Sequence, residues 1–152
     1  MGATLREVLT AARGRLPRAE ADAEVARLLD QVRLPASYAR RRPAALSGGE
    51  RRRAAVARAL AARPELLICD EAVAALDVSV QAQLLSLLGK LRESEGFAVL
   101  FVTHDLAAVR QLAHRVVVMP RGRVAEEGPA VRVLDHPEHP WTRRMLDGHL
   151  TP

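Results

Sequence analysis

The chain has 152 residues, of which 49% are hydrophobic and 27% are charged, a balance typical of one globular domain with one core. Only 3% of the residues are aromatic, and the formal net charge is +5. A basic chain with so few aromatic side chains lacks the stacking surfaces of many nucleic-acid-binding proteins, and we expect no nucleic acid partner. The short arginine clusters at 40–42 and 51–53 are interpreted as solvated faces.

Cysteine content and hydropathy indicate in which cellular compartment the chain is expected to work. Its one cysteine, Cys69, excludes an internal disulfide, and its place in the apolar run LLIC predicts a buried structural thiol. The first residues, MGATLREVL, contain no apolar signal core. No apolar run approaches the roughly 18 residues that span a bilayer. We therefore expect a cytoplasmic chain that can still work at a membrane through a partner.

Hydrophobic periodicity predicts helices in the first part of the chain. Two helices are expected between residues 5 and 32. Residues 33–46, RLPASYARRRPAAL, are interpreted as a loop because two prolines interrupt them. A third helix is expected from about Glu50 to Ala62, and it must end before Pro64.

Short apolar runs and one long amphipathic segment follow. The run ELLICDE at 65–71 and the run FAVLFVTHD at 97–105 are typical of strands buried on both faces. Between them, residues 78–95 predict an amphipathic helix that Gly96 closes. Its apolar face is expected to carry Val80, Leu84, Leu87, Leu88 and Leu91. This alternation of strand and helix predicts an α/β fold with mainly parallel core strands.

The last part of the chain predicts smaller elements. Residues 106–113 are interpreted as a short helix, and residues 115–128 as two strands around a turn. A tail rich in proline and histidine follows from residue 129.

The Ser-Gly-Gly-Glu segment at residues 47–50 has both a local and a functional interpretation. Ser47 and Glu50 fit the S-x-x-E capping box of a helix N-terminus. Capping does not explain Gly48 and Gly49, because glycine is unfavourable in a first turn unless something must approach the backbone closely. Unpaired backbone N–H groups at a helix N-terminus attract anions, so a phosphate is a candidate ligand.

Polar residues end both apolar runs, and open α/β sheets bind ligands at the carboxyl ends of their strands. Asp70 and Glu71 end the first run, and Thr103 and His104 end the second. Adjacent carboxylates suit metal-assisted phosphoryl transfer, in which one holds Mg²⁺ and the other activates the attacking water. A nearby histidine can hydrogen-bond a terminal phosphate. Each feature alone is also common as an ordinary solvated or structural residue.

Four motifs in order resemble the second half of an ATP-binding cassette (ABC) ATPase. They are LSGGE at 46–50 (signature), LLICDE at 66–71 (Walker B), ALD at 75–77 (D-loop) and VTHD at 102–105 (switch histidine). The segments LDVSVQAQLLSLLGKL and HPEHPWTRRML are similar to the oligopeptide and dipeptide importer branch.

The resemblance implies a role for each motif. The signature serine and glycines, here Ser47, Gly48 and Gly49, would contact the terminal phosphate of ATP bound on the opposite subunit, and Glu50 completes the candidate nucleotide-binding motif. Asp70 would support Mg²⁺, Glu71 would be the general base and His104 the switch. Asp77 would couple the two sites of the dimer. Plain helix capping by Ser47 and by Asp77 is the simpler alternative, and it is compatible with these roles.

The same resemblance implies a partial P-loop NTPase fold of the ABC type. A helical subdomain would occupy residues 1–62, the second half of the nucleotide-binding core residues 63–128, and an importer-type tail residues 129–152. The cofactors would be ATP and Mg²⁺ at a shared site. The partners would be a second ABC ATPase subunit, membrane permease subunits and, indirectly, a solute-binding protein. The chain would lie at the inner face of the cell membrane and serve solute import, with peptides as the expected solutes.

Several positions depart from the family pattern. No G-x-x-x-x-G-K-[ST] loop occurs in the sequence and the usual Q-loop is missing, so we expect a truncated carboxyl-terminal half. Ala72 and Val73 replace the usual Pro-Thr or Pro-Ser, which predicts a less restrained Glu71. Glu50 replaces the commoner glutamine and places a mildly repulsive acid beside a phosphate. Trp141 replaces a tyrosine, which we interpret as a tolerated aromatic exchange.

Two alternatives from other classes stay open. The chain can be a non-catalytic remnant or an interaction module that docks on a permease or on a full-length ATPase. It can also derive from a DNA-repair or chromosome ATPase, although the long coiled coils or zinc cysteines that accompany the signature there are missing from the sequence. The HPEH pair at 136–139 could be mistaken for a metal site, but its prolines and the importer-type tail argue against that.

Overall fold

A computed structural model describes residues 1–74 and 76–150, and these form two compact units. The first unit comprises Met1–Ile68 and Val73–Leu100, and the second comprises Cys69–Ala72 and the chain from Phe101 onward. The subdomain boundaries expected at residues 62 and 128 remain predictions, since a compact unit and a family subdomain need not coincide.

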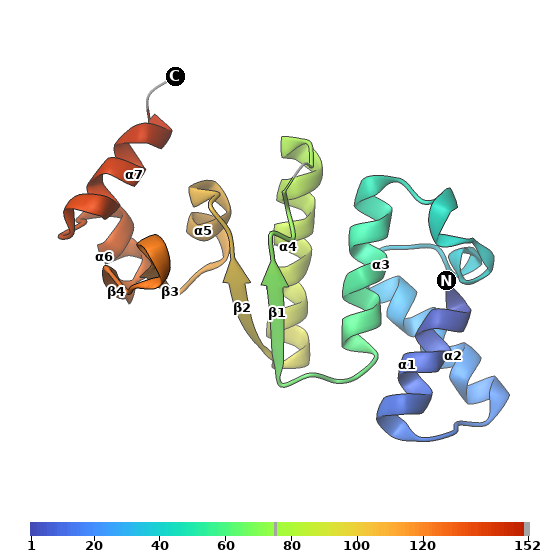
Figure 1. Cartoon of the computed structure of the whole chain (residues 1–152). Coiled ribbons are helices and arrows are strands. Elements are labelled where there is room, and N and C mark those ends of the chain that lie inside the picture. Colours follow the sequence, from blue (N-terminus) through green and yellow to red (C-terminus); the bar gives the residue numbers. More distant parts are fainter. Residues whose placement is uncertain (75, 151–152) are drawn as a thin grey trace. The chain divides into compact units, whose positions relative to one another are not determined.

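The chain up to residue 102 is mainly helical, with two short strands (Figure 1). Its elements are α1 (Gly2–Arg13), α2 (Arg18–Gln31), the 3₁₀ turns η1 (Ala36–Arg40) and η2 (Pro43–Ala45), α3 (Gly48–Leu60), β1 (Leu66–Asp70), α4 (Val78–Glu95) and β2 (Ala98–Val102). The predicted helices are therefore confirmed. The loop expected at residues 33–46 is wrong in part, because Pro35 immediately precedes the 3₁₀ turn η1 and Pro43 is the first residue of the 3₁₀ turn η2.

Helices α1, α2 and α3 pack against one another and enclose a core of aliphatic side chains. Leu5, Leu9, Val25, Leu28 and Leu29 are among its fully buried side chains. Helix α3 begins two residues earlier than expected because Ser47 is its N-cap, and it ends four residues before Pro64. Helix α4 is closed by Gly96, whose φ of 76° is the left-handed conformation that glycine adopts without strain.

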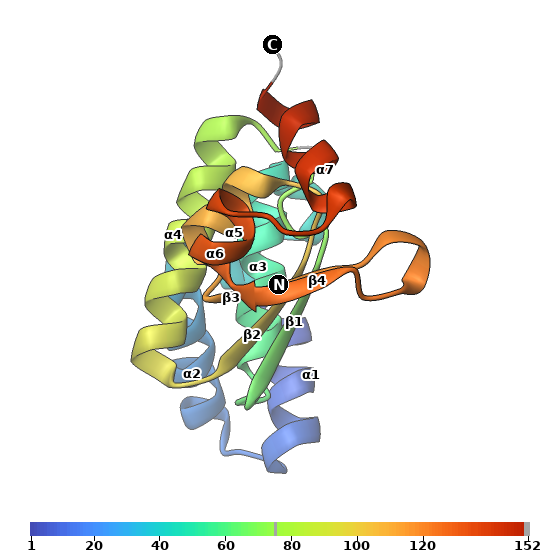
Figure 2. The same ribbon diagram turned by 90° about the vertical axis from the view of Figure 1, so that its left-hand side faces the viewer.

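Strands β1 and β2 pair in parallel, as the sequence predicts. The expectation that both strands are buried on both faces is wrong. Leu66, Ile68 and Leu100 are 50%, 62% and 50% exposed, whereas Leu67 is buried. Helix α4 runs along one face of β1 (Figures 1 and 2), and nothing in the described part of the chain covers the other face. Cys69 is buried as predicted.

The second unit contains a strand hairpin and three helices. These elements are α5 (Leu106–Leu112), β3 (Arg115–Val118), the 3₁₀ turn η3 (Pro120–Gly122), β4 (Glu126–Pro129), α6 (Ala130–Asp135) and α7 (Pro140–Leu150). Strands β3 and β4 are antiparallel, with Arg115 opposite Pro129 and Val118 opposite Glu126. The predicted hairpin and short helix are confirmed. The buried side chains of α6 and α7 form a small core with partly buried residues of α5 and β3.

The HPEHP segment is fastened to this hairpin by one carboxylate. Glu126 accepts hydrogen bonds from the backbone N–H of Glu138 (2.9 Å) and of His139 (3.1 Å). These bonds favour the ionised carboxylate and lower the pKa of Glu126 below its ordinary value. Each helix in the described part of the chain is too short or too polar to cross a bilayer.

Candidate functional site

The start of α3 is held by a complete capping box. Ser47 Oγ accepts a hydrogen bond from the backbone N–H of Glu50 (3.2 Å), and Glu50 Oε2 accepts one from the backbone N–H of Ser47 (2.7 Å). The N-cap role predicted for Ser47 is therefore confirmed. The Ser47 side chain also lowers the pKa of Glu50 through a hydrogen bond, so a ligand at the start of α3 would compete with this carboxylate for the hydroxyl proton.

Tyr38 also contacts the capping box, and the sequence does not predict this contact. Its hydroxyl donates to Glu50 Oε1 at 2.6 Å, so both carboxylate oxygens of Glu50 are hydrogen-bonded. The Tyr38 hydroxyl and the Ser47 backbone N–H lower the pKa of Glu50. Tyr38 lies in the 3₁₀ turn η1, 12 positions before its partner, and no sequence pattern pairs the two residues.

The two signature glycines have different surroundings. A Cβ added at Gly49 would lie 2.8 Å from Val80 Cγ1 of α4, so any larger residue at position 49 would force Val80 or the helices to shift. A Cβ at Gly48 would be 4.0 Å from Leu76 Cδ2, and Gly48 is exposed. Packing within the chain therefore favours glycine at position 49, whereas the described neighbours of position 48 leave room for a larger side chain.

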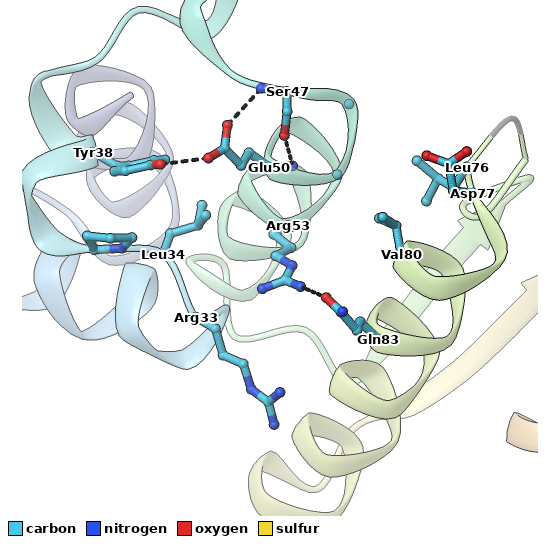
Figure 3. A pocket seen from close by; sticks show the side chains of 13 residues that line it. Arg33, Leu34, Tyr38, Ser47, Glu50, Arg53, Leu76, Asp77, Val80 and Gln83 are labelled. Atoms are coloured by element: carbon cyan, nitrogen blue, oxygen red, sulfur yellow. Dashed lines mark hydrogen bonds between the residues drawn. The ribbon is translucent and has the colours of Figure 1, made fainter.

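An open cavity of about 450 Å³ lies beside the start of α3 (Figure 3). Its walls come from the segment between α2 and η1, from η1 itself, from the start of α3 and from the start of α4. The lining residues are Arg33, Leu34, Pro35, Tyr38, Ser47, Gly48, Gly49, Glu50, Arg53, Leu76, Asp77, Val80 and Gln83. The structure thus brings the four predicted signature residues and Asp77 to one cavity.

Asp77 precedes α4 at its N-cap position but makes no side-chain capping bond, so the alternative of an Asp77 cap is not realised. Ala75, the first residue of the predicted D-loop, lies outside the described residues. Two side chains tie α3 to the segment around Asp77. Arg52 Nη2 donates to the Ala74 carbonyl (2.8 Å), and Arg53 Nη2 donates to Gln83 Oε1 (2.7 Å; Figure 3).

The second group of predicted residues lies in the second unit. His104 Nδ1 and Glu71 Oε1 are 2.9 Å apart, and this contact raises the pKa of His104 above its ordinary value. Glu71 directly follows β1 with a left-handed φ of 48°, and its backbone N–H donates to the Val102 carbonyl at 2.9 Å. The carboxylate and imidazole that were predicted to act together are thus in contact.

The backbone on both sides of His104 is fixed by short-range hydrogen bonds. Thr103 Oγ1 accepts from the Asp105 N–H at 3.0 Å. Asp105 Oδ1 in turn accepts from the N–H groups of Ala107 and Ala108, which caps α5. The imidazole therefore projects from a constrained turn between β2 and α5.

Asp70 ends β1 with an exposed side chain. No group of three or more metal-ligating side chains occurs among the described residues. One carboxylate is compatible with Mg²⁺, which commonly keeps several waters and takes its other ligands from substrate phosphates.

Comparison with known proteins agrees with these features. A family model described as ABC transporter matches residues 2–74. A Brucella abortus (strain 2308) protein, provisionally named as a peptide import ATP-binding protein, is 48% identical over 147 residues. That alignment covers 97% of this chain and 44% of the relative. The chain belongs to the ABC transporter ATPase family.

Other ABC proteins support the assignment and show the extent of the match. The glutathione import ATP-binding protein GsiA of Escherichia coli (strain K12) is 47% identical over 133 residues, or 88% of this chain and 21% of GsiA. The solved dimeric ATP-binding cassette MJ0796, bound to ADP and Pi, superposes with a TM-score of 0.70 at 31% identity over 84% of this chain and 56% of that one. The predicted ABC-type P-loop NTPase fold is confirmed, and the chain spans less than half the length of these curated relatives.

Proposed function

We propose that this ABC chain supplies the signature half of an ATP-binding subunit that couples ATP hydrolysis to solute import, with peptides as the solute class. The observation that carries the proposal is the exposed, capped start of α3 at an open cavity. Unpaired N–H groups of the first turn and the Ser47 hydroxyl form an anion-binding arrangement there. The names of the relatives support import as the process and peptides as the solutes.

In this proposal the signature residues bind the terminal phosphate of ATP held by the P-loop of a second subunit. Ser47 donates its hydroxyl proton, and the exposed Gly48 lets the phosphate approach the backbone. Asp77 lies at the same cavity and would couple this site to the other site of the dimer.

The second unit would supply the catalytic groups. Glu71 is the candidate general base, and the His104 contact orients its carboxylate. His104 is the candidate switch that hydrogen-bonds a phosphate. Asp70 would hold Mg²⁺, which when bound neutralises charge on the phosphates. The P-loop that cradles those phosphates would have to come from outside these 152 residues.

The proposed partners are a second ABC ATPase subunit, membrane permease subunits and, through them, a solute-binding protein. The chain would then work in the cytoplasm at the inner face of the membrane. A non-catalytic module that docks on a permease or on a full-length ATPase is the second candidate function. That role needs no P-loop, whereas the ATPase role needs a G-x-x-x-x-G-K-[ST] loop in addition to these 152 residues.

ATP-dependent association tests the proposal. The chain is mixed with a full-length ABC ATPase of the peptide-import type whose own Walker B glutamate is replaced by glutamine, and sedimentation velocity is measured with and without ATP. We expect a mixed complex only with ATP, and we expect Gly48→Asp in this chain to abolish it. Gly148→Asp is the matched control, because that helical glycine also has open space around it. Association that is independent of ATP and of Gly48→Asp would favour the docking module instead.

A further inference from the structure

Glu50 places a carboxylate beside the exposed start of α3, where a phosphate is proposed to bind. A carboxylate repels a phosphate bound beside it, so it would partly offset the attraction of the phosphate to the N–H groups of the helix N-terminus. The chain therefore needs a way to hold this carboxylate and to compensate its charge.

Two hydrogen bonds hold the Glu50 carboxylate in place. Oε1 accepts from the Tyr38 hydroxyl at 2.6 Å, and Oε2 accepts from the Ser47 backbone N–H at 2.7 Å (Figure 3). Two donors on two different oxygens fix the plane of the carboxylate. The Tyr38 hydroxyl and the Ser47 backbone N–H contribute more to holding the ionised carboxylate than the Ser47 side chain does.

Arg41 compensates the charge of the Glu50 carboxylate. Its guanidinium carbon lies 3.9 Å from the centroid of the Tyr38 ring, a cation–π distance. The Arg41 charge also favours ionised Glu50. The carboxylate in turn raises the pKa of Tyr38, so the phenol keeps its proton and remains a donor at neutral pH. The three side chains thus form a row of carboxylate, phenol and guanidinium.

We propose that Tyr38 is a positioning residue that, together with Arg41, holds and compensates the Glu50 carboxylate so that an acidic signature motif can accept the terminal phosphate of ATP. The inference rests on the proposed role of the signature motif. It adds that an acid at position 50 depends on the hydroxyl at position 38, whereas a neutral amide at position 50 does not.

The test measures the ATP concentration for half-maximal association with the hydrolysis-blocked full-length ABC ATPase. Four forms of the chain are compared, namely wild type, Tyr38→Phe, Glu50→Gln and the double variant. We expect Tyr38→Phe to raise the half-maximal ATP concentration roughly two- to tenfold, the range for loss of one hydrogen bond. In the double variant we expect no loss relative to Glu50→Gln alone. Ser37→Ala is the control, since it alters an exposed side chain of the same turn η1.

Each result has a distinct meaning. If Tyr38→Phe raises the half-maximal ATP concentration equally with and without Glu50→Gln, Tyr38 has only a structural role and the inference is overturned. No loss in either background would also overturn it while leaving the proposed function intact. If wild type shows no ATP-dependent association, the proposed function itself fails. Carboxyl NMR titration gives a readout without ligand: Tyr38→Phe should raise the pKa of Glu50, and an unchanged pKa would contradict the inference.

Discussion

His104 Nδ1 lies 2.9 Å from Glu71 Oε1, which makes the predicted switch and the predicted base direct neighbours although 33 residues separate them in sequence. Both side chains are well exposed, at 79% and 45%, so solvent screens their interaction. The contact nevertheless favours the imidazolium form, because the carboxylate accepts a hydrogen bond from the ring N–H and attracts the positive charge.

The first prediction is that His104 titrates above the ordinary histidine pKa and that Glu71→Gln brings its pKa back down. NMR titration of the His104 ring protons measures this. Because the folded pKa is raised, any stabilisation by the pair is complete below about pH 6.5 and is lost as the pH rises through the folded pKa. Glu127→Gln, which alters a carboxylate beside Arg115, is the control. A His104 pKa unaffected by Glu71→Gln would contradict the observed pairing.

The second prediction separates the two signature glycines. Gly49→Ala should destabilise the chain by about 1–3 kcal/mol, because its Cβ would meet Val80 Cγ1 at 2.8 Å. Gly48→Ala should be neutral or stabilising by up to about 1 kcal/mol, since alanine is the better helix former and the space is open. Urea denaturation of each variant measures both effects.

A double variant checks the cause of the Gly49 effect. Val80→Ala should relieve the crowding, so that Gly49→Ala costs less stability in that background than in the wild type. Strictly additive effects of the two substitutions would contradict the packing explanation.

The third prediction concerns the attachment of the HPEHP segment. Glu126 binds two backbone N–H groups there, and its pKa is lowered. The stabilisation is therefore present above the ordinary carboxyl pKa of about 4.3 and is lost as the pH falls through the lower folded value. Hydrogen exchange at the Glu138 and His139 amides should accelerate at acid pH relative to the intrinsic rate. Glu126→Gln should show the faster exchange at neutral pH already. Equal protection of these amides in the wild type and in Glu126→Gln would contradict a stabilising role for the Glu126 hydrogen bonds.

The fourth prediction follows from the uncovered face of β1. Ile68 is 62% exposed in a two-stranded sheet, and exposed apolar strands promote association. Ile68→Thr should lower self-association of the chain, measured by light scattering against concentration. Leu67→Thr on the opposite, buried face is the matched control, and it should cost about 2 kcal/mol or more of stability without improving solubility. Unchanged scattering for Ile68→Thr would show that this face does not drive association.

Local signals in the sequence predicted the local structure. The capping box at Ser47 and Glu50 and the closure of α4 at Gly96 depend on residues within one turn, and the structure has both. The strand runs were also located correctly, because continuous apolar stretches bounded by polar residues are distinctive.

Features that depend on distant residues could not be predicted in this way. The Tyr38 hydrogen bond to Glu50 depends on how η1 folds back on α3. The crowding of Gly49 by Val80 depends on the packing of α3 against α4. The burial of β1 depends on which elements pack on each of its faces. The apolar run predicts packing on both faces, whereas Leu66 and Ile68 on one face are exposed in this chain.

ATP turnover by a mixed pair tests the central claim most directly. This chain is combined with a full-length ABC ATPase that has an intact P-loop, and each chain is also assayed by itself. The account predicts no turnover by this chain alone, and loss of the pair's added turnover with Gly48→Asp, which places a negative side chain at the open glycine. Glu71→Gln in this chain should have a much smaller effect, because it belongs to the site without a P-loop. Equal loss from both substitutions, or full activity with Gly48→Asp, would contradict the claim that the start of α3 completes the partner's ATP site.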